Sequence, residues 1–480
     1  MWGNKRVLTQ NYPLPTAPRI VGRQPQGLPS PGTGTNRHAS KGETMPIITR
    51  RALGMGAATA LFTPALRSRA AEAQSSVTQN LPKTYSGTTL NIVWGPDPVN
   101  QAIAAYSRNF MEATGIGISW TNVAHSERYQ KIILDTTSNT NSFDIYLNAY
   151  QWKQELAPFL IDHAHIDLEV KGAPPLDLDD YPKRALEVYT KVGPKMMALP
   201  LQGSLTFLVW NRKAYRDAGI DPGTAPKTWD EVYRNGLKLH AGPQYGYNLP
   251  AGKNIQAACQ WITLFQDLGG SYFDAKGLPA FDSPQAMNAM RLMATQLEKV
   301  SPPGNLTWDN PEMINAVATG QAAQGFMWTG GFSTLMDPAK SVVAHDLGYA
   351  ATPQGALLGG WAVSVNAKSR HLDAAKLYVA WLTSREISQA LAPITGQTAR
   401  ISSFQDKAAV QKFPVLPAVL AGLQGPLAEY PPIRQSEQIC IFIYNEASAV
   451  CAGTKTPEQG AADLQTSVMS FMKRRGYLHG

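Results

Sequence analysis

Aromatic and planar polar side chains recur where strand patterns end, and together they could form a binding site. The aromatic residues are Trp94, Tyr150, Trp152, Trp328, Phe332 and Trp361. The polar residues are Asp97, Glu127, Asn148, Gln202, Asn254 and Gln397. An aromatic ring packs against the C–H face of a sugar ring, while carboxylate and amide groups hydrogen-bond to hydroxyls. This combination predicts a site for a carbohydrate or a similar polyol.

Each of these residues also has a structural alternative. A single tryptophan on an apolar strand more often fills a core than contacts a ligand. Glycine pairs precede Phe332 and Trp361, and they leave the backbone open to close approach, which favours exposure of these two rings. Glu127 could instead cap the helix that begins nearby. Both roles stay open for the aromatic residues and for Glu127.

Motifs for covalent chemistry are absent or incomplete. No HExxH, GxSxG or GxGxxG pattern occurs in the sequence. The stretch from Gly246 to Asn254 departs from a phosphate loop in its glycine spacing and in its last residue. His163 and His165 lack cysteine partners and helical spacing, which favours a solvated loop over a metal site. We expect no enzyme activity, cofactor or metal, although two distant carboxylates could still meet as a glycosidase pair.

Short strand and helix patterns alternate after the first 86 residues. The expected elements are strands at 90–94, 116–120 and 143–147 and helices at 101–112 and 127–136. Units of this kind form a parallel sheet covered by helices. Such sheets bind ligands beyond the carboxyl ends of their strands. We therefore expect residues 94–97 and 148–152 to border a crevice.

The positive charge is concentrated at the start of the chain. The sequence holds 43 Lys and Arg against 35 Asp and Glu, and ten of the basic but only two of the acidic residues lie in residues 1–73. The remainder is formally neutral. It therefore has no electrostatic footprint for nucleic acid.

The basic leader resembles a twin-arginine signal peptide. Arg50 and Arg51 precede a short apolar run, and Ala71-Glu72-Ala73 fits a cleavage site. We expect residues 45–73 to be this signal and residues 1–44 to be a disordered extension or the product of a misplaced start. The protein is then periplasmic, and a retained membrane anchor is the alternative.

Cys259, Cys440 and Cys451 are the three cysteines of the sequence. The segment between Cys440 and Cys451 has the pattern of continuous secondary structure, which would hold the two apart. We expect free buried thiols rather than a disulfide framework.

Several segments resemble the extracellular solute-binding proteins of carbohydrate ABC transporters, family 1, which are similar to maltose-binding protein. The segments are 199–204, 208–213, 226–231, 315–331, 359–361 and 373–376. The resemblance covers residues 87–470. It implies an α/β fold of two lobes, joined by hinge strands around a central cleft.

The resemblance also implies lobe boundaries and further site residues. The expected N-terminal lobe combines 87–202 with 358–396, and the C-terminal lobe combines 203–357 with 397–480. The chain should cross between lobes near 201–206, 351–359 and 394–400. The implied solute contacts add Gly203, Ser204, Gly330 and Gly360 to the residues above, and they favour Phe332 as the stacking ring.

These observations predict a monomeric substrate-binding component of an ABC transporter. It would capture a sugar or a sugar-like polyol, close over it by a hinge motion and deliver it to permease subunits in the inner membrane. The implied solutes include phosphorylated polyols. The alternatives are a twin-arginine-exported enzyme acting on a carbohydrate and a sensor subunit with the same fold.

Overall fold

A computed structural model describes residues 75–353 and 355–478 of the protein. The predicted leader, residues 1–73, lies outside the described residues. Among the residues described, no helix combines the length and the apolar character that a membrane crossing requires.

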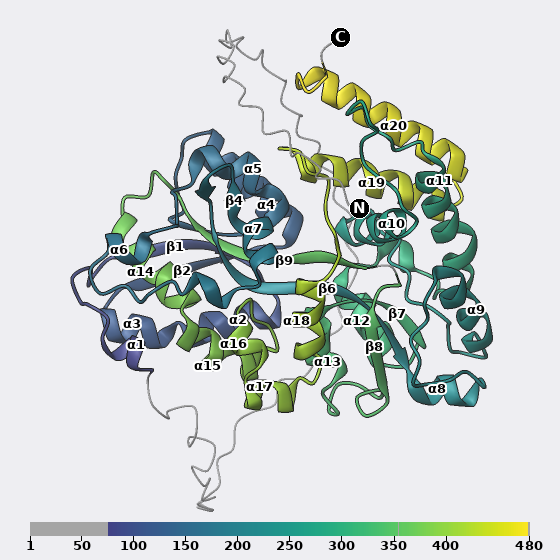
Figure 1. Ribbon diagram of the computed structural model, residues 1–480, viewed down its shortest axis with the longest axis horizontal. Helices are drawn as coiled ribbons and strands as arrows, with labels where there is room; N and C mark the ends of the chain where they lie inside the picture. Colours follow the sequence, from purple (N-terminus) through teal and green to yellow (C-terminus); the bar gives the residue numbers. More distant parts are fainter. Residues whose placement is uncertain (1–74, 354, 479–480) are drawn as a thin grey trace, which may run out of the picture. The chain divides into compact units, whose positions relative to one another are not determined.

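One mixed sheet runs through the described residues (Figure 1). Its strands are β1 (Thr89–Trp94), β2 (Gly117–Asn122), β3 (Ile145–Ala149), β6 (Leu199–Asn211), β7 (Gln324–Trp328), β8 (Leu347–Ala351), β9 (Ala356–Val365) and β10 (Leu427–Ala428). The order is β2-β1-β3-β9-β6-β7, with β8 beside β6 and β10 beside β9. A separate hairpin pairs β4 (Lys191–Val192) with β5 (Lys195–Met196).

Helices pack around this sheet. Those of residues 75–200 and 366–396 are α1 (Ser76–Gln79), α2 (Pro98–Tyr106), α3 (Arg108–Thr114), α4 (His125–Thr137), α5 (Lys153–Leu156), α6 (Ile166–Glu169), α7 (Lys183–Thr190), α14 (Leu372–Thr383) and α15 (Arg385–Thr395). The others are α8 (Arg212–Asp217), α9 (Trp229–Leu239), α10 (Ile255–Asp267), α11 (Pro284–Arg291), α12 (Asn310–Ala318), α13 (Phe332–Leu335), α16 (Ile401–Phe404), α17 (Lys407–Lys412), α18 (Leu416–Gln424), α19 (Ser436–Cys451) and α20 (Pro457–Arg474). Short 3-10 turns include η1 (Tyr150–Trp152), η3 (Leu178–Asp180) and η7 (Thr329–Gly331).

The alternation of strand and helix predicted from the sequence is confirmed. Strand β1 pairs in parallel with both β2 and β3. The helix expected at 101–112 is divided into α2 and α3 at Ser107. The Ser107 hydroxyl donates to the Ile103 carbonyl, which also accepts from the Ser107 amide, and it lies 2.8 Å from the Tyr378 hydroxyl. A side chain that bonds back to the preceding turn in this way often bends a helix.

Strands β6 and β9 belong to both halves of the sheet. Residues 199–205 of β6 pair with β9, and residues 206–211 pair with β7 and β8. In Figure 1, β1 and β2 lie to one side of this pair and β7 and β8 to the other. We call the halves the β1–β3 lobe and the β7–β8 lobe. Each has its own buried apolar cluster, around Ile92 and Trp381 in the first and around Trp261 and Phe326 in the second.

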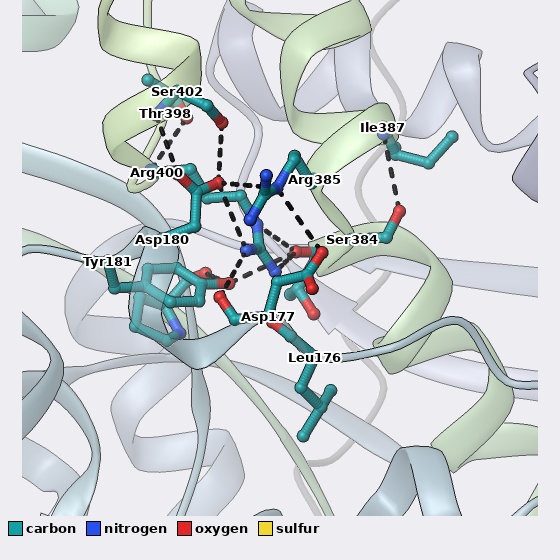
Figure 2. A network of polar contacts seen from close by, with 12 residues as sticks. Leu176, Asp177, Asp180, Tyr181, Ser384, Arg385, Ile387, Thr398, Arg400 and Ser402 are labelled. Carbon is teal, nitrogen blue, oxygen red and sulfur yellow. Dashed lines mark hydrogen bonds and ion pairs between the residues drawn. The ribbon is translucent and has the colours of Figure 1, made fainter.

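Arg400 holds the segment after α15 in place. Its guanidinium is buried and donates to the carbonyl oxygens of Thr383, Asp177 and Leu176, with Nε 2.7 Å from the Thr383 oxygen (Figure 2). Asp180 Oδ2 lies 3.6 Å from Nη1. A buried charge is tolerated when it is paired and hydrogen-bonded in this way. The third crossing expected from the sequence, near 394–400, is thus tied to η3.

Both C-terminal cysteines lie on α19. Cys440 and Cys451 are eleven residues apart on this helix, which corresponds to about 16 Å. A disulfide needs its Cα atoms within about 7 Å. All three cysteines are free and buried, as predicted.

The solvated loop predicted around His163 is wrong for His163 itself. This side chain is fully buried: its Nε2 accepts from the Val365 amide at 3.0 Å, and its Nδ1 lies 3.2 Å from the Met196 carbonyl oxygen. Both ring nitrogens are therefore engaged by the backbone. Burial lowers the pKa of His163 to about 4. His165 is exposed, as expected.

The buried imidazole of His163 should make the protein sensitive to acid. Its pKa is 6.5 in the unfolded chain and about 4 in the folded protein, so the unfolded chain takes up the proton first as the pH falls. This contribution to the free energy of unfolding should be complete above pH 6.5 and should decrease by roughly 3 kcal/mol between pH 6.5 and 4. Urea denaturation across this range should show a shallower loss for His163→Gln than for wild type. The exposed control His165→Gln should follow wild type, and equal slopes for His163→Gln and wild type would contradict the assignment.

Candidate functional site

A cavity of about 340 Å³ lies beyond the carboxyl ends of β1 and β3, where sheets of this kind bind ligands. Both lobes line it. The β1–β3 lobe contributes Asp97, His125, Arg128 and Gln151, the β7–β8 lobe contributes Gln256, Asp309, Trp328 and Tyr430, and the shared strands contribute Gln202, Ser204, Gly360 and Trp361. The volume and the mixture of aromatic and polar groups suit a small polar molecule.

A larger hollow of about 930 Å³ lies over η3, α7 and α18. Its lining includes Lys183, Arg184 and Glu187, which are charged side chains of α7. None of the site residues predicted from the sequence lines it, and it lies away from the strand ends. We therefore place the candidate site in the smaller cavity.

The structure brings together eight of the residues predicted from the sequence. Those that line the cavity are Asp97, Gln202, Ser204, Trp328, Gly330, Gly360, Trp361 and Gln397. They come from segments separated by up to 300 residues of sequence. Their contact with a solute stays a prediction.

Glycines let the aromatic and amide groups of this set approach the backbone. A Cβ atom at Gly359 would lie 2.3 Å from the Trp328 ring, and one at Gly330 would lie 2.4 Å from the Gln397 amide nitrogen. The Trp328 indole is also fixed by its Nε1, which donates to Gln256 Oε1 at 2.8 Å. The protein's own Trp328 and Gln397 side chains therefore occupy the space beside these glycines, and approach of a solute there stays a prediction.

Three predicted residues lie in the core instead. Trp94 is fully buried, and its Nε1 donates to the Asn100 carbonyl at 3.1 Å. Asn148 precedes the cavity residue Ala149 on β3, so its side chain is on the opposite face, where it accepts from the Ser364 hydroxyl. Tyr150 is buried, and its hydroxyl accepts from the Tyr430 amide.

Three others lie at helix starts or at the strand crossing and do not line the cavity. Glu127 is exposed on the first turn of α4, and the N-cap of α4, Ala124, makes no side-chain bond, so the alternative of a capping box is also wrong. Asn254 caps α10 and donates to the Trp308 carbonyl. Gly203 donates its amide to the Thr398 carbonyl at 2.8 Å.

Phe332, favoured as the stacking ring, lies in the core of the β7–β8 lobe. It is 1% exposed, and its ring packs edge-on against Phe207 and Tyr349 with centroids 5.3 and 5.4 Å away. The short helix α13 begins at this residue and turns the ring inward. Trp328 and Trp361 are the indole rings that reach the cavity.

Several cavity residues were not predicted from the sequence. They are His125, Arg128, Gln151, Gln256, Asp309 and Tyr430. Most lie on the first turn of a helix that begins at the cavity. The helix-start pattern could have indicated them, but a polar residue there is more often solvated, and sequence spacing does not show which helices begin at one place.

Burial sets the charges beside the cavity. Burial, and then the nearby Arg128 charge, lower the pKa of His125 to about 3, and burial raises the pKa of Glu437 to about 7. His125 is therefore neutral, and its Nδ1, 3.9 Å from Glu437 Oε1, forms no ion pair. Glu437 Oε2 accepts from Trp152 Nε1 at 2.8 Å. This bond links α19 of one lobe to η1 of the other.

A sheet shared by two lobes, with a polar and aromatic cavity where they meet, defines a two-lobed α/β solute-binding protein. The family model described as bacterial extracellular solute-binding protein matches residues 95–389. The chain belongs to this family, and it is the solute-binding component of an ABC transporter. The family and the fold predicted from the sequence are confirmed.

Relatives and solved structures agree with this assignment. The chain is 51% identical over 399 residues to a probable amino-acid ABC transporter periplasmic-binding protein of Sinorhizobium fredii, covering 83% of this chain and 93% of that protein. It is 22% identical over 399 residues to the mannitol-binding protein of Pseudomonas aeruginosa, covering 75% and 88%. A solute-binding protein of Agrobacterium radiobacter in complex with ribitol has a TM-score of 0.75 at 23% identity, covering 80% and 99%. One of Agrobacterium vitis with D-mannitol has a TM-score of 0.73 at 20% identity, covering 81% and 99%.

Substitution of Phe332 should affect stability, and substitution of Trp328 should affect solute binding. Phe332→Ala removes a ring from the core and should lower the free energy of unfolding by about 3 to 5 kcal/mol, while the folded protein keeps its solute affinity. Trp328→Ala removes a ring from the cavity wall and should weaken solute binding. Urea denaturation and calorimetric titration with a solute that binds wild type measure the two effects. If Phe332→Ala left stability unchanged but abolished solute affinity, Phe332 would belong to the binding site and not to the core.

Proposed function

We propose that this protein is exported by a twin-arginine signal, captures a sugar or a sugar-like polyol in the cavity between its lobes and delivers it to an ABC permease. The names of its relatives support this solute class, since they include a mannitol-binding protein and an erythritol/L-threitol-binding protein. Solved structures of the same fold hold ribitol, D-mannitol and maltose.

The main support for the proposal is the cavity wall, which contains both indole rings and buried polar atoms without a hydrogen-bond partner among the described residues. Trp328 and Trp361 line the cavity. Gln397 Oε1, Asn310 Oδ1 and Nε and Nη1 of Arg128 belong to the same lining and are buried without a hydrogen-bond partner. Buried polar groups normally find partners. The hydroxyls of a polyol both donate and accept, so they could satisfy acceptors and donors at once.

Closure of the lobes over the solute would use the shared strands. In this proposal the first lobe comprises 87–202 and 358–396, and the second comprises 203–357 and 397–480. The strand pairing shifts register between Pro200 and Gln202, and Gly360 has a φ of +106°, so both strands depart from regular geometry beside the cavity. A hinge at these residues would let solute binding favour the closed state.

An amino acid is the second candidate solute. The relative at 51% identity is named as a probable amino-acid binding protein. The cavity lining holds both acidic and basic side chains, Asp97 and Asp309 against Arg128, which could address a zwitterion. An enzyme or a sensor with this fold has less support, because the relatives are named as binding proteins of transporters.

A thermal-shift screen of the exported, monomeric protein should identify the solute class. The panel should contain monosaccharides, disaccharides, polyols, polyol phosphates and amino acids, with mass spectrometry of the recovered compound. A ligand at a hundred times its dissociation constant adds about 2.7 kcal/mol to the free energy of unfolding, which gives a shift of a few degrees. We expect a shift with a sugar or polyol that is recovered unchanged. Conversion of the compound would indicate an enzyme, and a shift with amino acids alone would indicate the second candidate.

A further inference from the structure

We infer that the cavity binds an anionic group of the solute, a carboxylate or a phosphate, at the start of helix α4 through Arg128. The solute then carries an acidic group, as a sugar acid, a polyol phosphate or an amino acid does. The inference rests on the proposed function only in taking this cavity as the solute site.

Arg128 is buried at the cavity and forms no hydrogen bond or ion pair with the described residues. The residue is 2% exposed and lines the cavity, and its Nε and Nη1 are buried with no hydrogen-bond partner. Its guanidinium lies over the Trp361 ring, with Cζ 4.1 Å from the ring centroid. This stacking orients the guanidinium but leaves its N–H groups free. A buried charge without hydrogen bonds is costly, so a ligand that pairs with it gains a strong contact.

Arg400 is a buried arginine with a structural role, and its hydrogen bonds offer a comparison with Arg128. It is 1% exposed, and each guanidinium nitrogen donates to a backbone carbonyl oxygen of Leu176, Asp177 or Thr383 (Figure 2). Asp180 lies beside it at 3.6 Å. Arg128 is equally buried and has no such partner among the described residues. The difference indicates that Arg128 pairs with a group that the described residues do not supply.

The acidic residues of the cavity are engaged elsewhere. Asp97 caps α2: its Oδ1 accepts from the Asn100 amide at 3.0 Å, and its Oδ2 accepts from the Asn100 side chain. Asp309 caps α12, where its Oδ1 accepts from the Asn310 amide and from Gln256 Nε2. Neither carboxylate lies within ion-pair distance of Arg128 among the described residues. His125 is neutral and adds no second positive charge beside Arg128.

The N-terminus of α4 is a second donor group at the same place. Helices α2, α10 and α12 also begin at the cavity, and their own side chains cap them. The 13-residue helix α4 has Ala124 as its N-cap and no side-chain cap bond. Ala124, His125 and Arg128 line the cavity on this first turn. Free amide groups and the helix dipole favour an anion there.

The guanidinium and the helix start together suit one planar or tetrahedral oxyanion. Arginine presents paired N–H groups that match two oxygens of a carboxylate or phosphate. Sugar acids, polyol phosphates and amino acids share such a group. Burial lowers the pKa of Arg128 and the nearby Asp97 carboxylate raises it, but this carboxylate forms no ion pair with the guanidinium among the described residues, and a neutral polyol would not supply one.

Calorimetric titration of the exported protein tests the inference with matched solutes. The panel is glycerol, ribitol and mannitol, each beside its aldonic acid and its phosphate, together with L-leucine and L-glutamate. We expect an acid or a phosphate to bind on the order of ten- to a hundredfold more tightly than its neutral parent. Comparison of the aldonic acids with the phosphates shows which of the two anionic groups the cavity prefers.

Variants of α4 assign that preference to Arg128. Arg128→Gln should remove the preference for the charged solute, and Arg128→Lys should keep part of it. Lys131→Gln removes the same charge from α4 outside the cavity and should behave as wild type.

Stability of the free protein gives an independent readout. Arg128→Met should unfold at the same temperature as wild type or at a higher one, because it removes an unpaired buried charge. Arg400→Met should unfold at a clearly lower temperature, because it leaves carbonyl oxygens without donors. A large destabilisation by Arg128→Met would make Arg128 structural and overturn the inference.

The remaining outcomes separate the inference from the proposed function. Equal affinity for neutral and charged solutes would overturn the inference and leave the polyol function intact. Binding of amino acids alone, abolished in Arg128→Gln, would support the inference and overturn the polyol solute. Binding of no compound in the panel would overturn both.

Discussion

The antiparallel pairing of β6 with β9 is the constraint on which the site depends. These two strands are shared by both lobes, and their pairing places Gln202, Ser204, Gly360 and Trp361 at the cavity. The approach is close: a Cβ atom at Gly360 would lie 2.2 Å from the Gln202 carbonyl oxygen. Only glycine allows this crossing at a φ of +106°. The lobes, the cavity and the hinge follow from this one junction.

Around this junction, some polar groups of the cavity are hydrogen-bonded within the protein, and others have no partner among the described residues. Arg400, Asp97 and Asp309 each hold a segment or cap a helix. Arg128, Asn310 and Gln397 have buried atoms without partners. Such atoms raise the free energy of the empty protein. In the proposed function, a solute that supplies partners would recover this energy on binding.

The sequence predicts the fold well and the site in part. Alternating patterns locate β1, β2, β3 and α4, and family motifs locate the shared strands. Trp328 is the last residue of β7, as the rule that ligands lie at strand ends expects, whereas Gln202 and Trp361 line the cavity from within β6 and β9. Trp94, Asn148 and Phe332 do not line it, and the sequence could not show this, because periodicity gives the strand but not which face its last residues present. Arg128 is missed because a charged residue on the first turn of a helix usually faces water, and only the tertiary structure shows it buried.

A crystal structure of residues 75–480 with bound solute would show whether the solute lies in this cavity. We expect density for the solute between the two lobes, in contact with Trp328 and Trp361 and with solute oxygens within hydrogen-bond distance of Arg128. Solute bound in the hollow over α7, or between the lobes with Arg128 still unpaired, would contradict this expectation.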